Sequence, residues 1–162
     1  MIGTLFTKTI LKEHMETQDQ LSAHKSRAIV LNCMDFRLID DLERFLDSAG
    51  YNNNYDDFVL AGASLGYNQT VYPTWKDVFN THVELAEQLH EIHEIIIIDH
   101  MNCGAYKKFY NRPSIPPEEE RTLHRKNLNK MERVLKKKFP TLGVKKYLMN
   151  LDGSVEDLNN RN

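Results

Sequence analysis

The sequence has few cysteines, no long apolar runs and no excess of charge of one sign. Its apolar runs stop at four residues, as at residues 28–31 and 95–98, whereas a membrane span needs about 20. Lysine and arginine number 21 against 23 acidic residues, and the formal net charge is -2. Charge and hydropathy therefore predict neither a nucleic-acid partner nor a membrane partner.

The start of the chain and its thiols point to a reducing compartment. Residues 1–10 lack the apolar core and cleavage site of a secretory signal, so we expect a cytoplasmic protein. Only two cysteines are present, Cys33 and Cys103. In such a compartment two thiols are more often metal ligands or reactive groups than a disulfide.

The alternation of elements predicts an α/β domain. Short β-branched runs alternate with longer amphipathic segments, which is typical of a mainly parallel sheet flanked by helices. Right-handed crossovers then favour the strand order 2-1-3-4. We expect strands at about residues 27–32, 57–61, 94–99 and 144–150, and helices at about 38–48, 74–89 and 117–138.

The chain is expected to have two parts. Residues 1–26 form an N-terminal helical arm, and residues 27–162 form the α/β domain. The arm's apolar positions are sparse, so we expect it to pack on a partner subunit rather than on its own core. These positions are Ile10, Leu11, Met15 and Leu21.

Both thiols follow strand-like segments. Cys33 comes directly after the first expected strand, and His100 and Cys103 follow the third. In the order 2-1-3-4 these strands are neighbours, and the carboxyl edge between them is where such sheets bind ligands. Two thiolates and an imidazole suit zinc. The sequence therefore predicts a zinc site formed by Cys33, His100 and Cys103.

Two alternatives remain for the fourth zinc ligand. A water molecule would make the site catalytic, whereas the carboxylate of Asp35 would close it. Asp35 and Arg37 lie two residues apart on an expected turn and could form a bidentate ion pair. Our hypothesis is a switch in which Arg37 either holds Asp35 away from the metal or releases it.

Each motif alone has an ordinary structural interpretation. Cys33 could be a small buried hydrophobe, and Asp35 could cap a helix. A purely structural zinc usually takes four protein ligands, and a redox pair usually has Cys-x-x-Cys spacing. Residues 62–66 match the Gly-x-Ser-x-Gly string of a serine nucleophile, but we interpret them as a loop because helix signals resume only at Thr74.

Histidines outside the motif are weaker candidates. His82 lies on the expected apolar stripe of the helix at 74–89, which also contains Val78 and Leu89, and is interpreted as a packed core residue. Three others, His90, His93 and His124, are expected to be exposed.

Two segments together resemble the β-class carbonic anhydrases. They are Cys-x-Asp-x-Arg after the first strand and His-x-x-Cys-Gly after Ile-Ile-Ile-Ile. The resemblance extends over about residues 27–152. The resemblance implies zinc on Cys33, His100 and Cys103, with Asp35 and Arg37 as the catalytic dyad. It also implies reversible hydration of carbon dioxide to bicarbonate by a metal-bound hydroxide, in a homodimer or larger homo-oligomer.

The chain also departs from that family. Many members have Arg-Asn-Ala-Gly where this chain has Val-Leu-Ala-Gly at residues 59–62. The departure leaves substrate preference open, and relatives of the fold hydrolyse carbon disulfide or carbonyl sulfide. A non-catalytic zinc-binding protein is the alternative from a different functional class.

Overall fold

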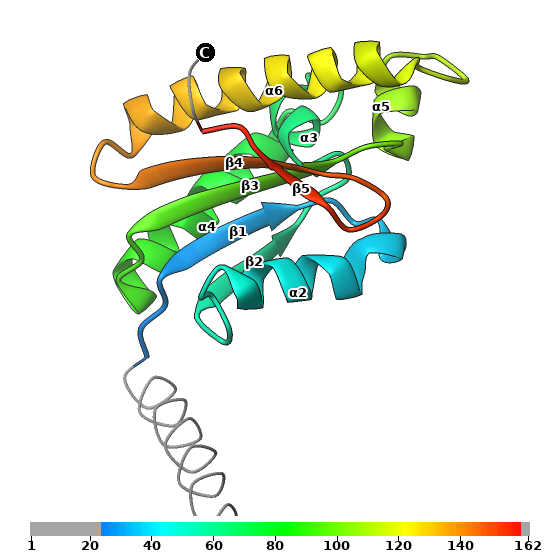
Figure 1. Cartoon of the computed structure of the whole chain (residues 1–162). Helices are drawn as coiled ribbons and strands as arrows, with labels where there is room; N and C mark the ends of the chain where they lie inside the picture. Colours follow the sequence, from blue (N-terminus) through cyan, green and yellow to red (C-terminus); the bar gives the residue numbers. More distant parts are fainter. Residues whose placement is uncertain (1–23, 160–162) are drawn as a thin grey trace, which may run out of the picture.

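The structure is a computed structural model that describes residues 24–159, which contain a five-stranded sheet in the order β2-β1-β3-β4-β5 (Figure 1). The expected order 2-1-3-4 is confirmed, and a short fifth strand adds an edge that the sequence did not predict. The parallel strands are β1 (Ala28–Asn32), β2 (Tyr55–Val59), β3 (Glu94–His100) and β4 (Gly143–Met149), and β5 (Val155–Asp157) is antiparallel to β4.

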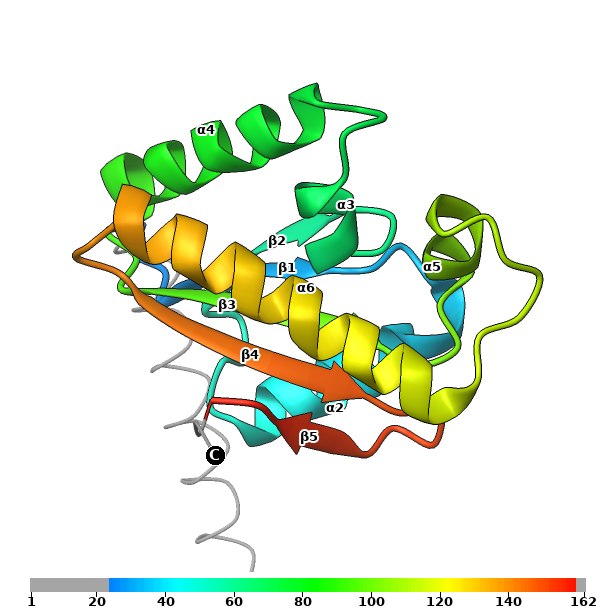
Figure 2. The same cartoon turned by 90° about the horizontal axis from the view of Figure 1, so that it is seen from above.

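Helices cover both faces of the sheet (Figure 2). Helix α2 (Ile39–Ser48) lies on one face, and α4 (Thr74–His90) and α6 (Pro117–Lys138) lie on the other. Along β3, Ile95 and Ile97 join the core beneath α4 and α6, whereas Ile96 and Ile98 join the core beneath α2. A strand that is covered on both faces needs a continuous apolar run, and the four isoleucines at residues 95–98 provide it.

The long helix α6 begins and ends where the sequence predicts. Pro117 is its first residue, three glutamates occupy its first turn and three lysines its last. Proline fits this position because it lacks the N–H that would have no partner there. The acidic start and basic end complement the helix dipole.

Two short helices, α3 (Ser64–Asn68) and α5 (Gly104–Phe109), complete the fold beside a 3-10 turn, η1 (Phe36–Leu38). The prediction of a loop across residues 62–66 was wrong, because α3 begins at Ser64. Gly62 and Ala63 have φ angles of 77° and 38°, so the chain turns sharply directly after β2. The Ser64 side chain is fully buried and donates a hydrogen bond to Asp99, which argues against a free nucleophile.

Helix α4 faces the sheet differently from the prediction. Its buried residues are Phe79, Asn80, Val83 and Ala86. Val78 and Leu89 of the expected stripe are 47% and 62% exposed, and His82 is exposed with its ring against Phe58. The helix has apolar residues on two faces, and only one of them can lie on the sheet.

The predicted N-terminal arm lies almost entirely outside the described residues, which begin at position 24. Within residues 24–159, no helix has the length and apolar character that crossing a membrane requires.

Candidate metal centre

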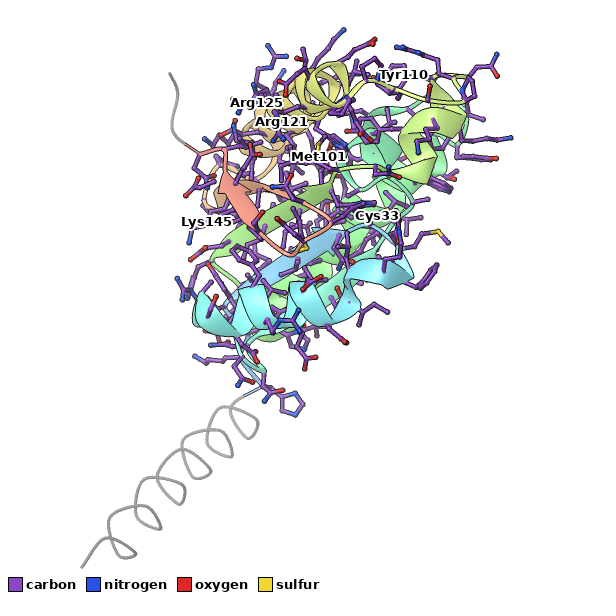
Figure 3. The ribbon with its side chains drawn as sticks, turned by 45° about the vertical axis from the view of Figure 1, so that its right-hand side comes forward. Cys33, Met101, Tyr110, Arg121, Arg125 and Lys145 are labelled. Atoms are coloured by element: carbon purple, nitrogen blue, oxygen red, sulfur yellow. The ribbon has the colours of Figure 1, made fainter. Side chains whose placement is uncertain are left out.

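Three donor side chains meet at the carboxyl edge of β1 and β3. Cys33 follows β1 directly, His100 is the last residue of β3, and Cys103 immediately precedes α5. Since β1 and β3 are paired in parallel, their ends lie side by side. The ligand atoms of the three residues all lie within 4.8 Å of one another. Figure 3 labels Cys33 at this edge of the sheet.

The spacing of the two sulfurs fits a shared metal ion. The Sγ atoms of Cys33 and Cys103 lie 3.9 Å apart. Two sulfurs bound to one tetrahedral zinc at about 2.3 Å each would be about 3.8 Å apart. This separation is too long for a disulfide bond, whose sulfurs lie about 2.05 Å apart.

The imidazole of His100 is oriented as a ligand. Its Nδ1 donates a hydrogen bond to the backbone oxygen of Met101 at 2.9 Å, which leaves the lone pair on Nε2. This Nε2 is buried and has no hydrogen-bond partner among residues 24–159. A buried nitrogen acceptor without a partner is costly unless something binds it, so the ring fits a metal ligand.

The two thiols are electrostatically coupled. The hydrogen bond from Cys103 lowers the pKa of Cys33 to about 4, although burial opposes this change. The hydrogen bond to the Cys33 thiolate, together with burial, raises the pKa of Cys103 well above its usual value. Two thiolates this close repel each other, and a divalent cation between them would remove that cost.

Asp35 and Arg37 form a bidentate pair next to the thiols. The Nε and Nη2 atoms of Arg37 donate to the two carboxylate oxygens of Asp35 at 2.9 and 2.7 Å. Nη2 also donates to the backbone oxygen of Asn102 at 3.2 Å, in the loop between His100 and Cys103. These contacts to Arg37 lower the pKa of Asp35 to about 2. Its Oδ2 lies 3.7 Å from Nε2 of His100 and therefore faces the donor cluster.

A cleft of about 610 Å³ opens over this cluster. Cys33, Asp35 and Cys103 line it together with large apolar side chains. Near its rim the ring of Tyr72 stacks on Trp75, with centroids 4.6 Å apart. Its remaining large apolar lining residues are Met34, Phe36 and Phe109, and Lys107 and Lys108 add positive charge.

Among the other histidines, the structure corrects two predictions. His82 is exposed rather than part of the core, and His124, expected at the surface, is fully buried. His93 is exposed as expected, and His90 is half-buried and paired with Asp56. None of these four side chains lines the cleft over the donor cluster.

Sequence reasoning missed two buried carboxylates beside the cluster. Asp99 and Glu120 are 1% and 4% exposed. Asp99 could have been noticed as a charge directly after four isoleucines in a buried strand, because buried carboxylates are rare unless they have partners. Glu120 lies in the helix α6 and accepts the backbone N–H of Cys103 at 2.9 Å.

The fold class follows from the sheet order and the elements around it, and solved structures share it. The chain is similar to a tetrameric β-carbonic anhydrase of Sordaria macrospora, at 16% identity and a TM-score of 0.55, covering 97% of this chain and 95% of that one. It is also similar to the β-carbonic anhydrase CafA of Aspergillus fumigatus, at 12% identity and a TM-score of 0.52, covering 97% and 87%. At these identities the likeness shows the β-carbonic anhydrase fold.

Sequence comparison identifies the family of the chain. The model of the family described as "Putative carbonic anhydrase" matches residues 23–159. The chain therefore belongs to this carbonic anhydrase family. It is 35% identical over 153 residues to an uncharacterized protein of Rickettsia bellii, covering 94% of this chain and 90% of the relative. An uncharacterized protein of Rickettsia conorii is 33% identical over 152 residues, covering 93% and 82%.

Proposed function

We propose that this protein is a zinc enzyme that catalyses the reversible hydration of carbon dioxide to bicarbonate. The observation that carries the proposal is the convergence of Cys33, His100 and Cys103 within 4.8 Å at the carboxyl edge of the sheet. Membership in the carbonic anhydrase family and the β-carbonic anhydrase fold support the same reaction.

The donor set favours zinc over harder cations. Two thiolates and one imidazole are soft-to-borderline ligands, whereas magnesium and calcium prefer oxygen. Three protein ligands leave one tetrahedral position open, which is typical of catalytic zinc. A bound zinc ion would supply Lewis acidity at that position.

Asp35 and Arg37 would orient the reactants. The bidentate contact with Arg37 holds the Asp35 carboxylate as an anion that faces the donor cluster. There it can accept a hydrogen bond from the attacking water molecule and fix the direction of attack. If the pair with Arg37 opened, Asp35 could instead become the fourth ligand and close the site. We propose that this pair controls access to the metal.

The cleft suits a small apolar substrate. Aromatic and thioether side chains line it above the donor cluster. Carbon dioxide fits such a wall, and so do carbon disulfide and carbonyl sulfide. Hydrolysis of these sulfur compounds is therefore the second candidate reaction, and a zinc-binding protein without catalysis is the third candidate function.

We propose a homo-oligomer and a cytoplasmic location as part of this function. The sheet-edge residue Val59 and the second face of α4 remain exposed, with Val78, Leu85 and Leu89 at 44–62%. Exposed apolar patches of this kind mark association surfaces. A second copy of the chain would cover them, and the similar enzyme of Sordaria macrospora is tetrameric. Two thiols that must stay reduced to bind metal favour the cytoplasm.

Stopped-flow assays combined with elemental analysis test this function. We expect about one zinc per chain and rapid hydration of carbon dioxide, and we expect Cys33→Ser to lose both. Ser48→Ala, at the end of α2 away from the donor cluster, serves as the control for a substitution of similarly small size. Turnover of carbon disulfide but not carbon dioxide would favour the second candidate, and bound zinc without either reaction would favour the third.

A further inference from the structure

A buried polar network lies between the metal centre and α6, a helix that supplies no candidate ligand. Its five side chains are 4% exposed or less, although all of them are polar or charged. Burying such groups is costly unless each has hydrogen-bond partners. The network consists of Ser64 from α3, Asp99 from β3, Tyr106 from α5, and Glu120 and His124 from α6.

Asp99 is the centre of this network. Its Oδ2 accepts hydrogen bonds from the hydroxyls of Ser64 and Tyr106 at 2.6 and 2.8 Å, and from Nδ1 of His124 at 2.8 Å. Its Oδ1 accepts the backbone N–H of Ser64 at 3.0 Å. One carboxylate thus joins α3, α5 and α6 directly before the candidate ligand His100.

Glu120 holds the loop of the second thiol. Its two carboxylate oxygens accept the backbone N–H groups of Asn102 and Cys103 at 3.1 and 2.9 Å. Asn102 has a φ angle of 58°, a left-handed conformation that is unfavourable for most side chains. The paired hydrogen bonds therefore stabilise a left-handed turn that determines where the Cys103 sulfur lies.

The same network reaches the first thiol through α3. Asp99 fixes both the backbone and the hydroxyl of Ser64, which ends the turn that begins at Gly62. The backbone N–H of Gly62 donates to Sγ of Cys33 at 3.3 Å. Position 62 has little room for a side chain, because a Cβ there would lie 3.0 Å from the Cβ of Ala105.

His124 connects the two halves of the network. Its Nδ1 donates to Asp99, and its Nε2 lies 3.8 Å from Oε1 of Glu120, beyond hydrogen-bond distance and with no hydrogen-bond partner among residues 24–159. Its ring also lies against Tyr106, with centroids 3.8 Å apart. A displacement of α6 would therefore move the supports of both sulfurs together.

We propose that Glu120 is a positioning residue for the metal centre, and that it acts with Asp99 and His124 from outside the ligand set. Glu120 fixes the position of the Cys103 sulfur through hydrogen bonds to the backbone. Through contacts with His124 and Asp99 it also affects the turn that supports Cys33. This inference rests on the proposed zinc site. Partners that orient metal ligands typically contribute about 10- to 100-fold to metal affinity.

Glu120→Gln tests the proposal, because glutamine keeps the shape but offers only one carbonyl oxygen to the two N–H groups. We expect the zinc-loaded variant to release metal to a chelator about 10- to 100-fold faster than the wild type. The thiolate-to-metal absorption band of the cobalt-substituted protein should also change. Glu119→Gln, at the exposed neighbouring residue that pairs with Arg112, should leave both measurements unchanged.

A stability control separates positioning from general weakening. Leu46→Ala removes a fully buried side chain on the opposite face of the sheet and should lower the melting temperature. At a temperature where all variants are folded, Leu46→Ala should keep the wild-type cobalt spectrum. The proposal is wrong if Leu46→Ala changes metal release and the spectrum as much as Glu120→Gln does. It is also wrong if Glu120→Gln behaves like Glu119→Gln.

A milder substitution keeps the test decisive if Glu120→Gln does not fold. Tyr106→Phe removes only the hydroxyl that donates to Asp99, and it should speed metal release about fivefold, as expected for one lost hydrogen bond. Unchanged release in this variant would also contradict the proposal. A wild-type chain that binds no zinc would instead overturn the proposed function itself, and the positioning role with it.

Discussion

The two ends of the same strands have contrasting polar clusters (Figure 3). At the amino ends, Glu94 accepts contacts from Arg27 at 3.2 Å, from Lys145 at 2.6 Å and from the Tyr51 hydroxyl at 2.7 Å. The Arg27 guanidinium also lies 4.4 Å from the centre of the Tyr51 ring. Both of these cations therefore contact the same carboxylate within the chain.

The carboxyl ends are built in the opposite way. Two sulfurs and the buried Nε2 of His100 face one another, and Nε2 has no hydrogen-bond partner among residues 24–159. The cluster at the amino ends pairs charges of opposite sign, whereas the two sulfurs and the imidazole nitrogen bring electron-pair donors together, an arrangement that a bound cation would stabilise. The comparison teaches that the candidate site is distinguished by this convergence of donor atoms, which includes the unpartnered Nε2 of His100, rather than by the number of polar groups.

Loss of a ligand should give the largest effect. We expect Cys103→Ser to abolish zinc binding and to lower the rate of carbon dioxide hydration at least about a thousandfold, since the remaining side chains cannot supply Lewis acidity. Elemental analysis and stopped-flow assays measure both effects. Tyr51→Phe at the other end should leave zinc content and rate unchanged, and a loss of zinc there would break the comparison.

Asp35→Asn should act on the rate without removing the metal. The amide keeps the shape of the carboxylate but cannot pair with Arg37 through two acceptor oxygens, so the orienting hydrogen bond is lost. We expect the hydration rate to fall about a hundredfold while zinc remains bound.

The matched control is Asp40→Asn, on the exposed first turn of α2. It should keep the wild-type rate. An Asp35→Asn variant with the full rate would show that this carboxylate takes no part in the reaction.

Glu94→Gln should affect stability alone. Removing the charge leaves Lys145 and Arg27 without their shared counter-charge, and we expect the free energy of unfolding to fall by about 1–2 kcal/mol. Denaturant titration measures this change. Zinc content and hydration rate should stay at wild-type values, whereas Glu91→Gln in the exposed pair with Lys25 should change none of the three.

The smallest expected effect is the pH dependence of the stability difference between the wild type and Glu94→Gln. Burial acts to raise the pKa of Glu94, but its contacts with Lys145 and Tyr51 outweigh burial and lower it from 4.5. The stabilisation is therefore complete above pH 4.5 and is lost as the pH falls through the folded-state pKa. The stability difference between the wild type and Glu94→Gln should narrow below that pH, and a widening difference would contradict the assignment.

The sequence alone predicted the sheet order and brought the three donors to one edge, because both follow from strand spacing and parallel topology. We did not predict from it how deeply the polar network is buried. His124 and Glu120 lie four and eight residues before Leu128, a buried member of the inner stripe of α6. Extending that stripe by helical spacing would have placed both residues inside the protein. Residue type argued against burial, since glutamate is rarely buried without a partner and histidine is only intermediate.

The zinc content of the chain, measured by elemental analysis after purification and dialysis, tests the central claim most directly. The account predicts about one zinc ion per chain, held by Cys33, His100 and Cys103. A folded chain that retains no zinc even after incubation with the metal would contradict it.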